Sequence, residues 1–73
     1  STVAERREVF ALARGLSPRE REVLGQLATG ADSRTIARAL ALSEHTVNDH
    51  VRAVLAKCDA PTRAVLLSRI AGR

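Results

Sequence analysis

The stretch from residue 33 to residue 58, SRTIARALALSEHTVNDHVRAVLAKC, decides the fold because it predicts two short helices joined by a tight turn. The first helix is predicted over residues 33–40, with Ser33 as its N-cap. Residues 41–43 form the turn, and Ser43 caps a second helix that begins at residue 44. Apolar residues of the second helix recur at the spacing of one helical face: Val47, Val51, Val54, Leu55 and Cys58.

The opposite face of this second helix is mostly polar. It presents His45, Asn48, Asp49, Arg52 and Ala56. A helix with a packed inner face and a polar outer face that includes a cation suits the major groove of DNA. An ordinary helical hairpin with a solvated face would show the same periodicity, so the pattern alone leaves both interpretations open.

Composition predicts one small all-α domain. The chain has 73 residues and a single aromatic side chain, Phe10, so the core must consist of Leu, Val, Ile and Ala. No strand-like alternation is present. The formal net charge is +4, of which +3 lies in residues 31–73 and +1 in residues 1–30. The positive excess therefore accompanies the two-helix stretch, as binding to phosphates would require.

The sequence predicts a protein of the cytoplasm that does not enter membranes. Cys58 is the only cysteine, so no internal disulfide can form, and we expect it to be a small apolar core residue. No apolar run approaches the roughly 20 residues of a membrane span, and no signal peptide is visible. The chain begins with Ser1 rather than Met, so we expect a piece of a longer protein with an upstream sensing or receiver domain.

Two further helices are predicted before the central stretch. Thr2 and Glu5 fit a capping box at the start of a helix over residues 2–14, which Gly15 ends. Its inner face is expected to contain Val3, Phe10 and Ala13, with Val9 beside them. This first helix, residues 1–15, is either a linker that docks on the domain or part of a dimer contact.

The next helix has the strongest start signal in the chain. Ser17 caps it, Pro18 occupies the first helical position and Glu20 completes a capping box. The helix should run to about Thr29, with Gly30 as a left-handed cap. Because Glu20 lies at the edge of the apolar stripe, it is expected either to pair with Arg63 or to remain a solvated cap.

A last helix is predicted from a Thr62 cap to about residue 71, after Pro61 ends the preceding one. Val65, Leu66 and Ile70 give it more apolar surface than one side of a small bundle needs. We favour a dimer contact with a second copy of this helix, formed by Val65, Leu66, Arg69 and Ile70. The competing interpretation is that the apolar residues only close the core.

Read as one string, residues 16–67 resemble the LuxR-type (GerE/NarL-like) helix-turn-helix domain of bacterial transcription regulators. The matching pieces are LSPREREVL (16–24), ATG (28–30), SRTIARAL (33–40), LSEHTVNDHV (42–51), the Lys57 segment and Thr62-Arg63, in the family's order and spacing. The resemblance implies an all-α, four-helix bundle over residues 16–73, preceded by an additional N-terminal helix or linker. In this family the third helix enters the major groove and the last helix dimerises.

The resemblance also implies roles for single residues. The base-contacting positions fall on Asn48, Asp49 and Arg52. The contacts to the DNA backbone fall on Ser33, Arg34, Ser43, His45, Thr46 and Lys57. Many members carry Lys or Arg in place of Asn48, and an uncharged residue in place of Asp49. An acid on a groove-facing surface repels phosphates unless it accepts a hydrogen bond, for example from cytosine N4.

The residue types leave some of these roles open. Arg52 is suited to guanine O6 and N7 or, equally, to a phosphate, and Asn48 is suited to adenine N6 and N7 or to solvent. Lys57 would contact the DNA backbone or complement the helix dipole. His45 and Asp49 are four residues apart but have no third ligand at suitable spacing, so we expect no metal and no cofactor. No nucleophile, base and acid occur together, so we expect no enzyme.

Three functions compete at this stage. The leading hypothesis is sequence-specific binding of double-stranded DNA by a homodimeric output domain of a bacterial transcription regulator, with RNA polymerase as a possible further partner. Region four of a sigma factor has a similar pattern and would bind a promoter element as a monomer beside RNA polymerase. A protein-interaction module that has lost DNA binding is the third, because Asp49 is unfavourable near phosphates.

Overall fold

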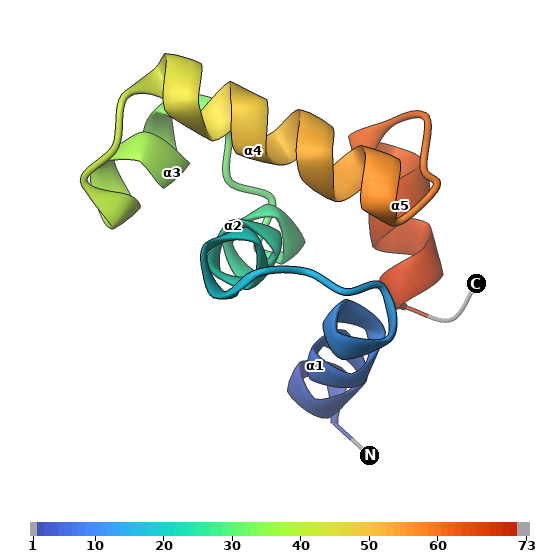
Figure 1. Cartoon of the computed structure of the whole chain (residues 1–73). Coiled ribbons are helices and arrows are strands. Elements are labelled where there is room, and N and C mark those ends of the chain that lie inside the picture. Colours follow the sequence, from blue (N-terminus) through green and yellow to red (C-terminus); the bar gives the residue numbers. More distant parts are fainter. Residues whose placement is uncertain (1, 72–73) are drawn as a thin grey trace.

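The computed structural model describes residues 2–71, and all secondary structure in that part is helical (Figure 1). The helices are α1 (Val3–Ala13), α2 (Pro18–Ala28), α3 (Ser33–Leu40), α4 (Glu44–Lys57) and α5 (Arg63–Ile70). The all-α prediction is confirmed, and the observed helix bounds differ from the predicted ones by at most one residue at each end.

Side-chain caps explain where the helices begin. Thr2, Ser17, Ser43 and Thr62 each accept a hydrogen bond from a backbone N–H three residues later, as predicted. The predicted cap of α3 was wrong by one residue. Asp32 Oδ1 accepts from Thr35 N over 2.8 Å, and Ser33 is the first residue of the helix. The hydroxyl of Ser33 is instead used in a contact between helices.

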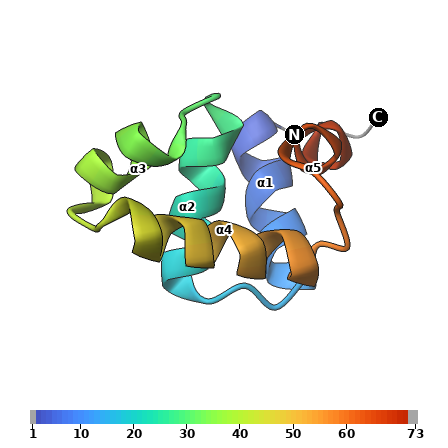
Figure 2. The ribbon, with the colours of Figure 1, turned by 90° about the horizontal axis from the view of Figure 1, so that it is seen from above.

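The core forms where α2 meets α4. Helix α2 also contacts α1, α3 and α5, and α3 packs along the first half of α4. Figures 1 and 2 show α3 and α5 at opposite ends of α4, with α2 beneath it. The largest fully buried side chains come from α2, α3, α4, α5 and the residue after α4: Val23, Leu24, Ile36, Val47, Val54, Leu66 and Cys58. Helix α4 is therefore held along one whole side.

Helix α1 packs through a different face from the predicted one. Ala11 is 1% exposed and joins the core, and Phe10 packs partly against it. Val9 is 66% exposed and Ala13 is also exposed, so the predicted inner face was wrong for these two residues. The side chain of Val3 lies outside the described part. The small Ala11 side chain suits a close approach to neighbouring helices, which an apolar count along one face does not reveal.

Four residues between the helices adopt positive φ. Gly15 (φ +70°) and Gly30 (φ +85°) were predicted to end α1 and α2 in this way. Ala41 (φ +56°) and Asp59 (φ +51°) end α3 and α4 in the same left-handed region, where a Cβ atom is unfavourable. Ala41 sets the tight turn between α3 and α4, in which Leu42 N donates to Ala37 O over 2.9 Å.

Candidate nucleic-acid interface

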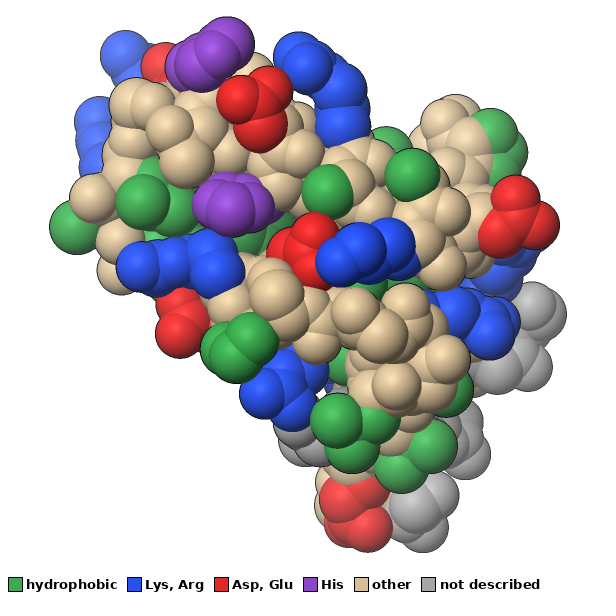
Figure 3. All heavy atoms as spheres, viewed as in Figure 1, with side chains coloured by type: hydrophobic (Ala, Val, Ile, Leu, Met, Phe, Trp, Pro, Cys, Tyr) green, Lys and Arg blue, Asp and Glu red, His purple; other side chains and the backbone are tan. Residues whose placement is uncertain are grey.

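Helix α4 divides into a buried face and an exposed face, as its periodicity predicted. Val47 and Val54 are fully buried and Val51 is 4% exposed. His45 and Arg52, about two turns apart, are exposed on the other side. Where α4 faces away from α2, at the top of Figure 3, histidine, acidic and basic side chains lie close together. The arrangement presents a polar helix face on a rigid support.

The acid on this outer face is paired with its neighbours. Arg52 Nη1 donates to Asp49 Oδ1 over 3.1 Å, and His45 Nε2 lies 3.5 Å from Asp49 Oδ2. The side chains of Asp49 and Arg52 are 52% and 73% exposed. An exposed pair of this kind contributes about 0–1 kcal/mol, so Arg52 can exchange Asp49 for another acceptor at little cost.

Asn48 lies at the flank of α4, where three helices meet. Arg63 Nη2 from α5 donates to Ser33 Oγ over 2.7 Å, and Ser33 Oγ donates to Asn48 Oδ1 over 2.6 Å. The predicted pairing of Arg63 with Glu20 was therefore wrong. Among the predicted site residues, the structure brings Ser33 of α3 and Asn48 of α4 into direct contact.

Glu20 pairs with Lys57 instead. Lys57 Nζ lies 2.7 Å from Glu20 Oε1, and the same oxygen accepts from Ser17 N over 2.8 Å. Glu20 is 6% exposed, so it is a buried cap rather than a solvated one. The hydrogen bond from Lys57, followed by the one from the Ser17 backbone, lowers the pKa of Glu20 despite its burial. The Lys57 side chain remains 42% exposed, and its contact with DNA stays a prediction.

The predicted contacts to the DNA backbone other than Lys57 lie at helix starts. Arg34 is exposed in the first turn of α3. At the start of α4, Ser43 Oγ accepts from Thr46 N over 3.1 Å and lies 2.9 Å from Thr46 Oγ1. Helix N-termini attract phosphate, and both starts belong to the helix-turn-helix. The contacts of these residues with the DNA backbone stay predictions.

Helix α5 closes the core with residues that were assigned to a dimer contact. Leu66 is fully buried and Ile70 is 6% exposed within the single chain, which was the competing interpretation. Arg69 Nη1 donates to the carbonyl oxygens of Cys58 and Asp59 and so holds the turn before α5. Val65 is half-buried. The dimer contact through this helix stays a prediction, with less surface available than the sequence indicated.

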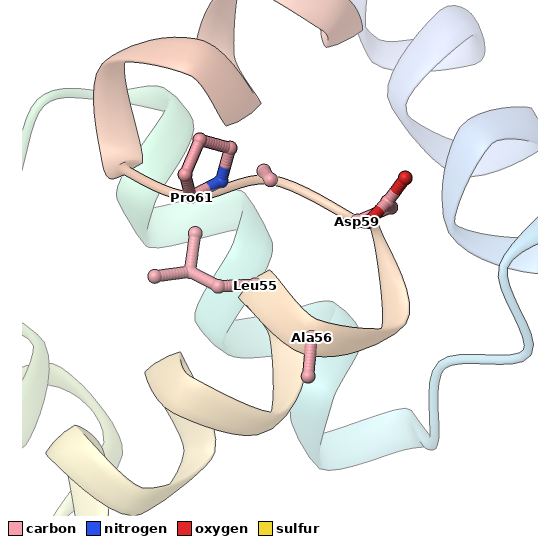
Figure 4. Close-up of a pocket in the computed structure, with 5 residues that line it drawn as sticks. Leu55, Ala56, Asp59 and Pro61 are labelled. Carbon is pink, nitrogen blue, oxygen red and sulfur yellow. The ribbon is translucent and has the colours of Figure 1, made fainter.

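A surface hollow lies beside the end of α4 (Figure 4). Its lining consists of Leu55, Ala56, Asp59, Ala60 and Pro61. One ionisable side chain among apolar ones does not provide the several converging polar groups that orient a small ligand. Cys58 nearby is buried, and burial raises the pKa of its thiol.

The described residues offer neither a metal site nor a membrane-spanning helix. Over residues 2–71, no three His, Cys, Asp or Glu side chains gather in a way that could hold a metal ion. Over the same range, no helix is long and apolar enough to cross a membrane.

Comparison with known proteins places this sequence in a family. Residues 14–70 match the family described as "Bacterial regulatory proteins, luxR family". The chain belongs to this luxR family. The luxR-family chain is 41% identical over 54 residues to the "Monoamine regulon transcriptional regulator" of Klebsiella aerogenes. The matched stretch covers 74% of this chain and 24% of that relative. No solved structure gave a significant match.

A second relative points the same way. The "Uncharacterized transcriptional regulatory protein YxjL" of Bacillus subtilis (strain 168) is 46% identical over 52 residues, covering 71% of the luxR-family chain and 24% of that relative. The chain thus spans about a quarter of the length of both relatives. Family membership supports DNA-binding transcription regulation, and this family is not one of enzymes.

Sequence reasoning missed two parts of this site. It placed Asn48 on the open face and Arg63 beside Glu20, whereas Ser33 joins Asn48 to Arg63. Ser33 lies 15 positions before Asn48, and Asn48 lies 15 positions before Arg63. The three residues belong to different helices, so the periodicity within one helix does not connect them. One feature of the sequence could have indicated this contact. Because Asp32 caps α3, the Ser33 hydroxyl has no capping role and is available for a contact with another helix.

Proposed function

We propose that this chain is the output domain of a bacterial transcription regulator and binds a specific double-stranded DNA sequence. Helix α4 would enter the major groove, with Asn48, Asp49 and Arg52 facing the bases. Ser33, Arg34, Ser43, His45, Thr46 and Lys57 would contact the DNA backbone. Membership of the luxR family supports the general role.

One observation carries the proposal: α4 is fixed on one side by buried valines and carries exposed His45 and Arg52 on the other. A groove-reading helix needs both properties, because base contacts depend on a rigid register. The helix starts add to this, since Arg34 is exposed in the first turn of α3 and Ser43 caps the start of α4. The formal charge of +4 gives the attraction to phosphates that non-specific binding requires.

The test is in vitro selection from random duplex DNA near physiological salt, repeated with Arg52→Ala. The unaltered chain should enrich one sequence, and Arg52→Ala should lose the preference at one base pair. Arg19→Ala is the matched control, because it removes an exposed arginine of α2 that also pairs with a nearby acid. Loss of preference in both variants would indicate a general charge effect and contradict the assignment of Arg52.

We further propose that two copies associate through α5 and read an inverted repeat, with the two copies of α4 about 34 Å apart. Because Leu66 and Ile70 are largely buried, the contact would rely on the outer side of the helix, including Val65 and Arg69. Val65→Glu should then give a lower mass in sedimentation. An unchanged mass together with an enriched asymmetric site would favour a monomer of the sigma-factor region-four type.

The remainder of the regulator is also a proposal. The chain spans about a quarter of both relatives, so we propose an upstream sensing or receiver domain and a cytoplasmic location for the whole protein. RNA polymerase is the natural further partner of such a regulator. One observation favours the alternative of a protein-interaction module. Asp49, an acid that is unfavourable near phosphates, pairs with Arg52 on the outer face of α4. Selection without any enriched sequence would favour that module.

A further inference from the structure

A chain of two hydrogen bonds fixes the side chain of Asn48. Arg63 Nη2 donates to Ser33 Oγ over 2.7 Å, and Ser33 Oγ donates to Asn48 Oδ1 over 2.6 Å. Both bonds are partly buried, and the three residues come from α5, α3 and α4. One side chain of the proposed reading helix is therefore positioned by the two helices at either end of it.

The chemistry of the three groups determines which way the amide faces. A guanidinium group can only donate, so Ser33 Oγ accepts from Arg63. The Ser33 hydroxyl has one proton, and its acceptor among residues 2–71 is Asn48 Oδ1. With the amide reversed, Nδ2 could still donate to the second lone pair of Ser33 Oγ, but the Ser33 proton would lose its acceptor among residues 2–71. The amide is thus held with Oδ1 toward Ser33.

The other end of the amide reaches solvent. Every fully buried side-chain nitrogen or oxygen among the described residues has a hydrogen-bond partner. Over residues 2–71 the one hydrogen bond of the Asn48 side chain is made by Oδ1, so Nδ2 is not fully buried. Asn48 therefore offers a donor outward and keeps its acceptor inward.

We propose that Ser33 and Arg63 are positioning residues that make Asn48 a donor-only reader of the major groove. This inference rests on the proposed function. Guanine (N7 and O6) and thymine (O4) present acceptors there, whereas a bidentate contact to adenine needs Asn48 to accept from N6 as well as donate to N7. Cytosine presents the N4 donor. A donor-only Asn48 can still reach adenine N7, but it loses the second hydrogen bond to adenine. Guanine and thymine therefore gain relative to adenine, and the adenine preference expected from the residue type alone is suppressed.

The experiment is in vitro selection with the chain and five variants. Asn48→Ala identifies the base pair that Asn48 reads, because the preference is lost there. The unaltered chain should enrich guanine or thymine at that position. Ser33→Ala frees the amide and should admit adenine, shifting the ratio of guanine or thymine to adenine by roughly 5- to 150-fold. Ser33→Thr keeps the hydroxyl and should restore the original preference.

Arg63→Ala should shift the same ratio in the same direction, because Ser33 then loses the donor that fixes its proton. Arg38→Ala is its charge control: it removes an exposed arginine of α3 and should weaken all sequences equally. Ser33→Ala leaves the Asp32 cap in place, so a loss of helix α3 does not explain a changed ratio. A purely structural role of Ser33 would lower affinity without admitting adenine.

Two outcomes overturn the inference while leaving the proposed function intact. The first is adenine at the Asn48 position in the unaltered chain, and the second is an unchanged ratio in Ser33→Ala. Failure of the chain to enrich any sequence contradicts the proposed function itself. A measurement without DNA tests the hydrogen bond separately from the proposed function. In denaturant unfolding, the loss of unfolding free energy in the Ser33→Ala/Asn48→Ala double variant should be smaller than the sum of the losses in the two single variants. Additive losses would contradict the bond itself.

Discussion

Two ion pairs of α4 show how one helix serves two purposes. Lys57 and Glu20 lie 2.7 Å apart, with Glu20 almost completely buried between α4 and α2. Arg52 and Asp49 lie 3.1 Å apart on the outer face, with both side chains more than half exposed. The first pair cannot be separated without leaving a buried carboxylate, whereas the second can be exchanged for contacts with solvent or a ligand. Burial, rather than distance, distinguishes the pair that holds the fold from the pair available for binding.

The largest expected effect is on the inner pair. Glu20→Ala removes both the partner of Lys57 and the capping box of α2, so it should lower the free energy of unfolding by about 2 kcal/mol. Urea unfolding monitored by circular dichroism measures this. Glu20→Gln is the matched control, because its amide oxygen can still accept from Ser17 N, and it should lose less. Equal losses would show that the charge of Glu20 contributes everything and the cap nothing.

The outer pair should behave in the opposite way. Arg52→Ala should change the free energy of unfolding by less than about 0.5 kcal/mol, since an exposed pair contributes little. It should lower the affinity for the selected DNA site by about 1–3 kcal/mol if Arg52 contacts a base. Unfolding and binding titrations on the same protein sample measure both quantities. A large loss of stability would remove the distinction between the two pairs.

The inner pair also predicts a dependence on pH. The folded-state pKa of Glu20 is lowered below its ordinary value near 4.5, so its stabilising effect is complete above that pH. The effect is lost as the pH falls through the folded-state pKa. The difference in unfolding free energy between the unaltered chain and Glu20→Gln should therefore be constant near neutral pH and shrink in acid. A difference that grows in acid would contradict the pairing.

The smallest effect is expected for an exposed ion pair whose N···O distance is almost the same as that of Lys57 and Glu20. Arg19 Nη1 lies 2.8 Å from Glu22 Oε2, but their side chains are 45% and 53% exposed. Arg19→Ala should therefore change the free energy of unfolding by no more than about 0.5 kcal/mol. The measurement is urea unfolding beside Glu20→Ala. A loss as large as that of Glu20→Ala would show that distance matters more than burial.

Local features of the fold followed from the sequence. The caps at Thr2, Ser17, Ser43 and Thr62 were predicted because a cap and its target lie three residues apart. The buried stripe of α4 was predicted because it repeats with the period of the helix.

Contacts between helices did not follow from the sequence. Glu20 meets Lys57 across 37 positions, and Arg63 meets Ser33 across 30. Which of several cations reaches a given acceptor depends on how the helices cross, and neither local periodicity nor charge counts contain that information. The same limit explains why the sequence did not show that Leu66 and Ile70 are buried within the single chain, and why a dimer contact and core closure both stayed open for them.

The central claim is that the outer face of α4 reads DNA. The most direct test is competition binding near physiological salt, in which the unaltered chain and Arg52→Ala bind the selected site against the same site with its order scrambled. We predict a preference of the unaltered chain for the selected site that falls by roughly 5-fold or more in Arg52→Ala, at unchanged stability. An equal preference in both proteins would contradict the claim.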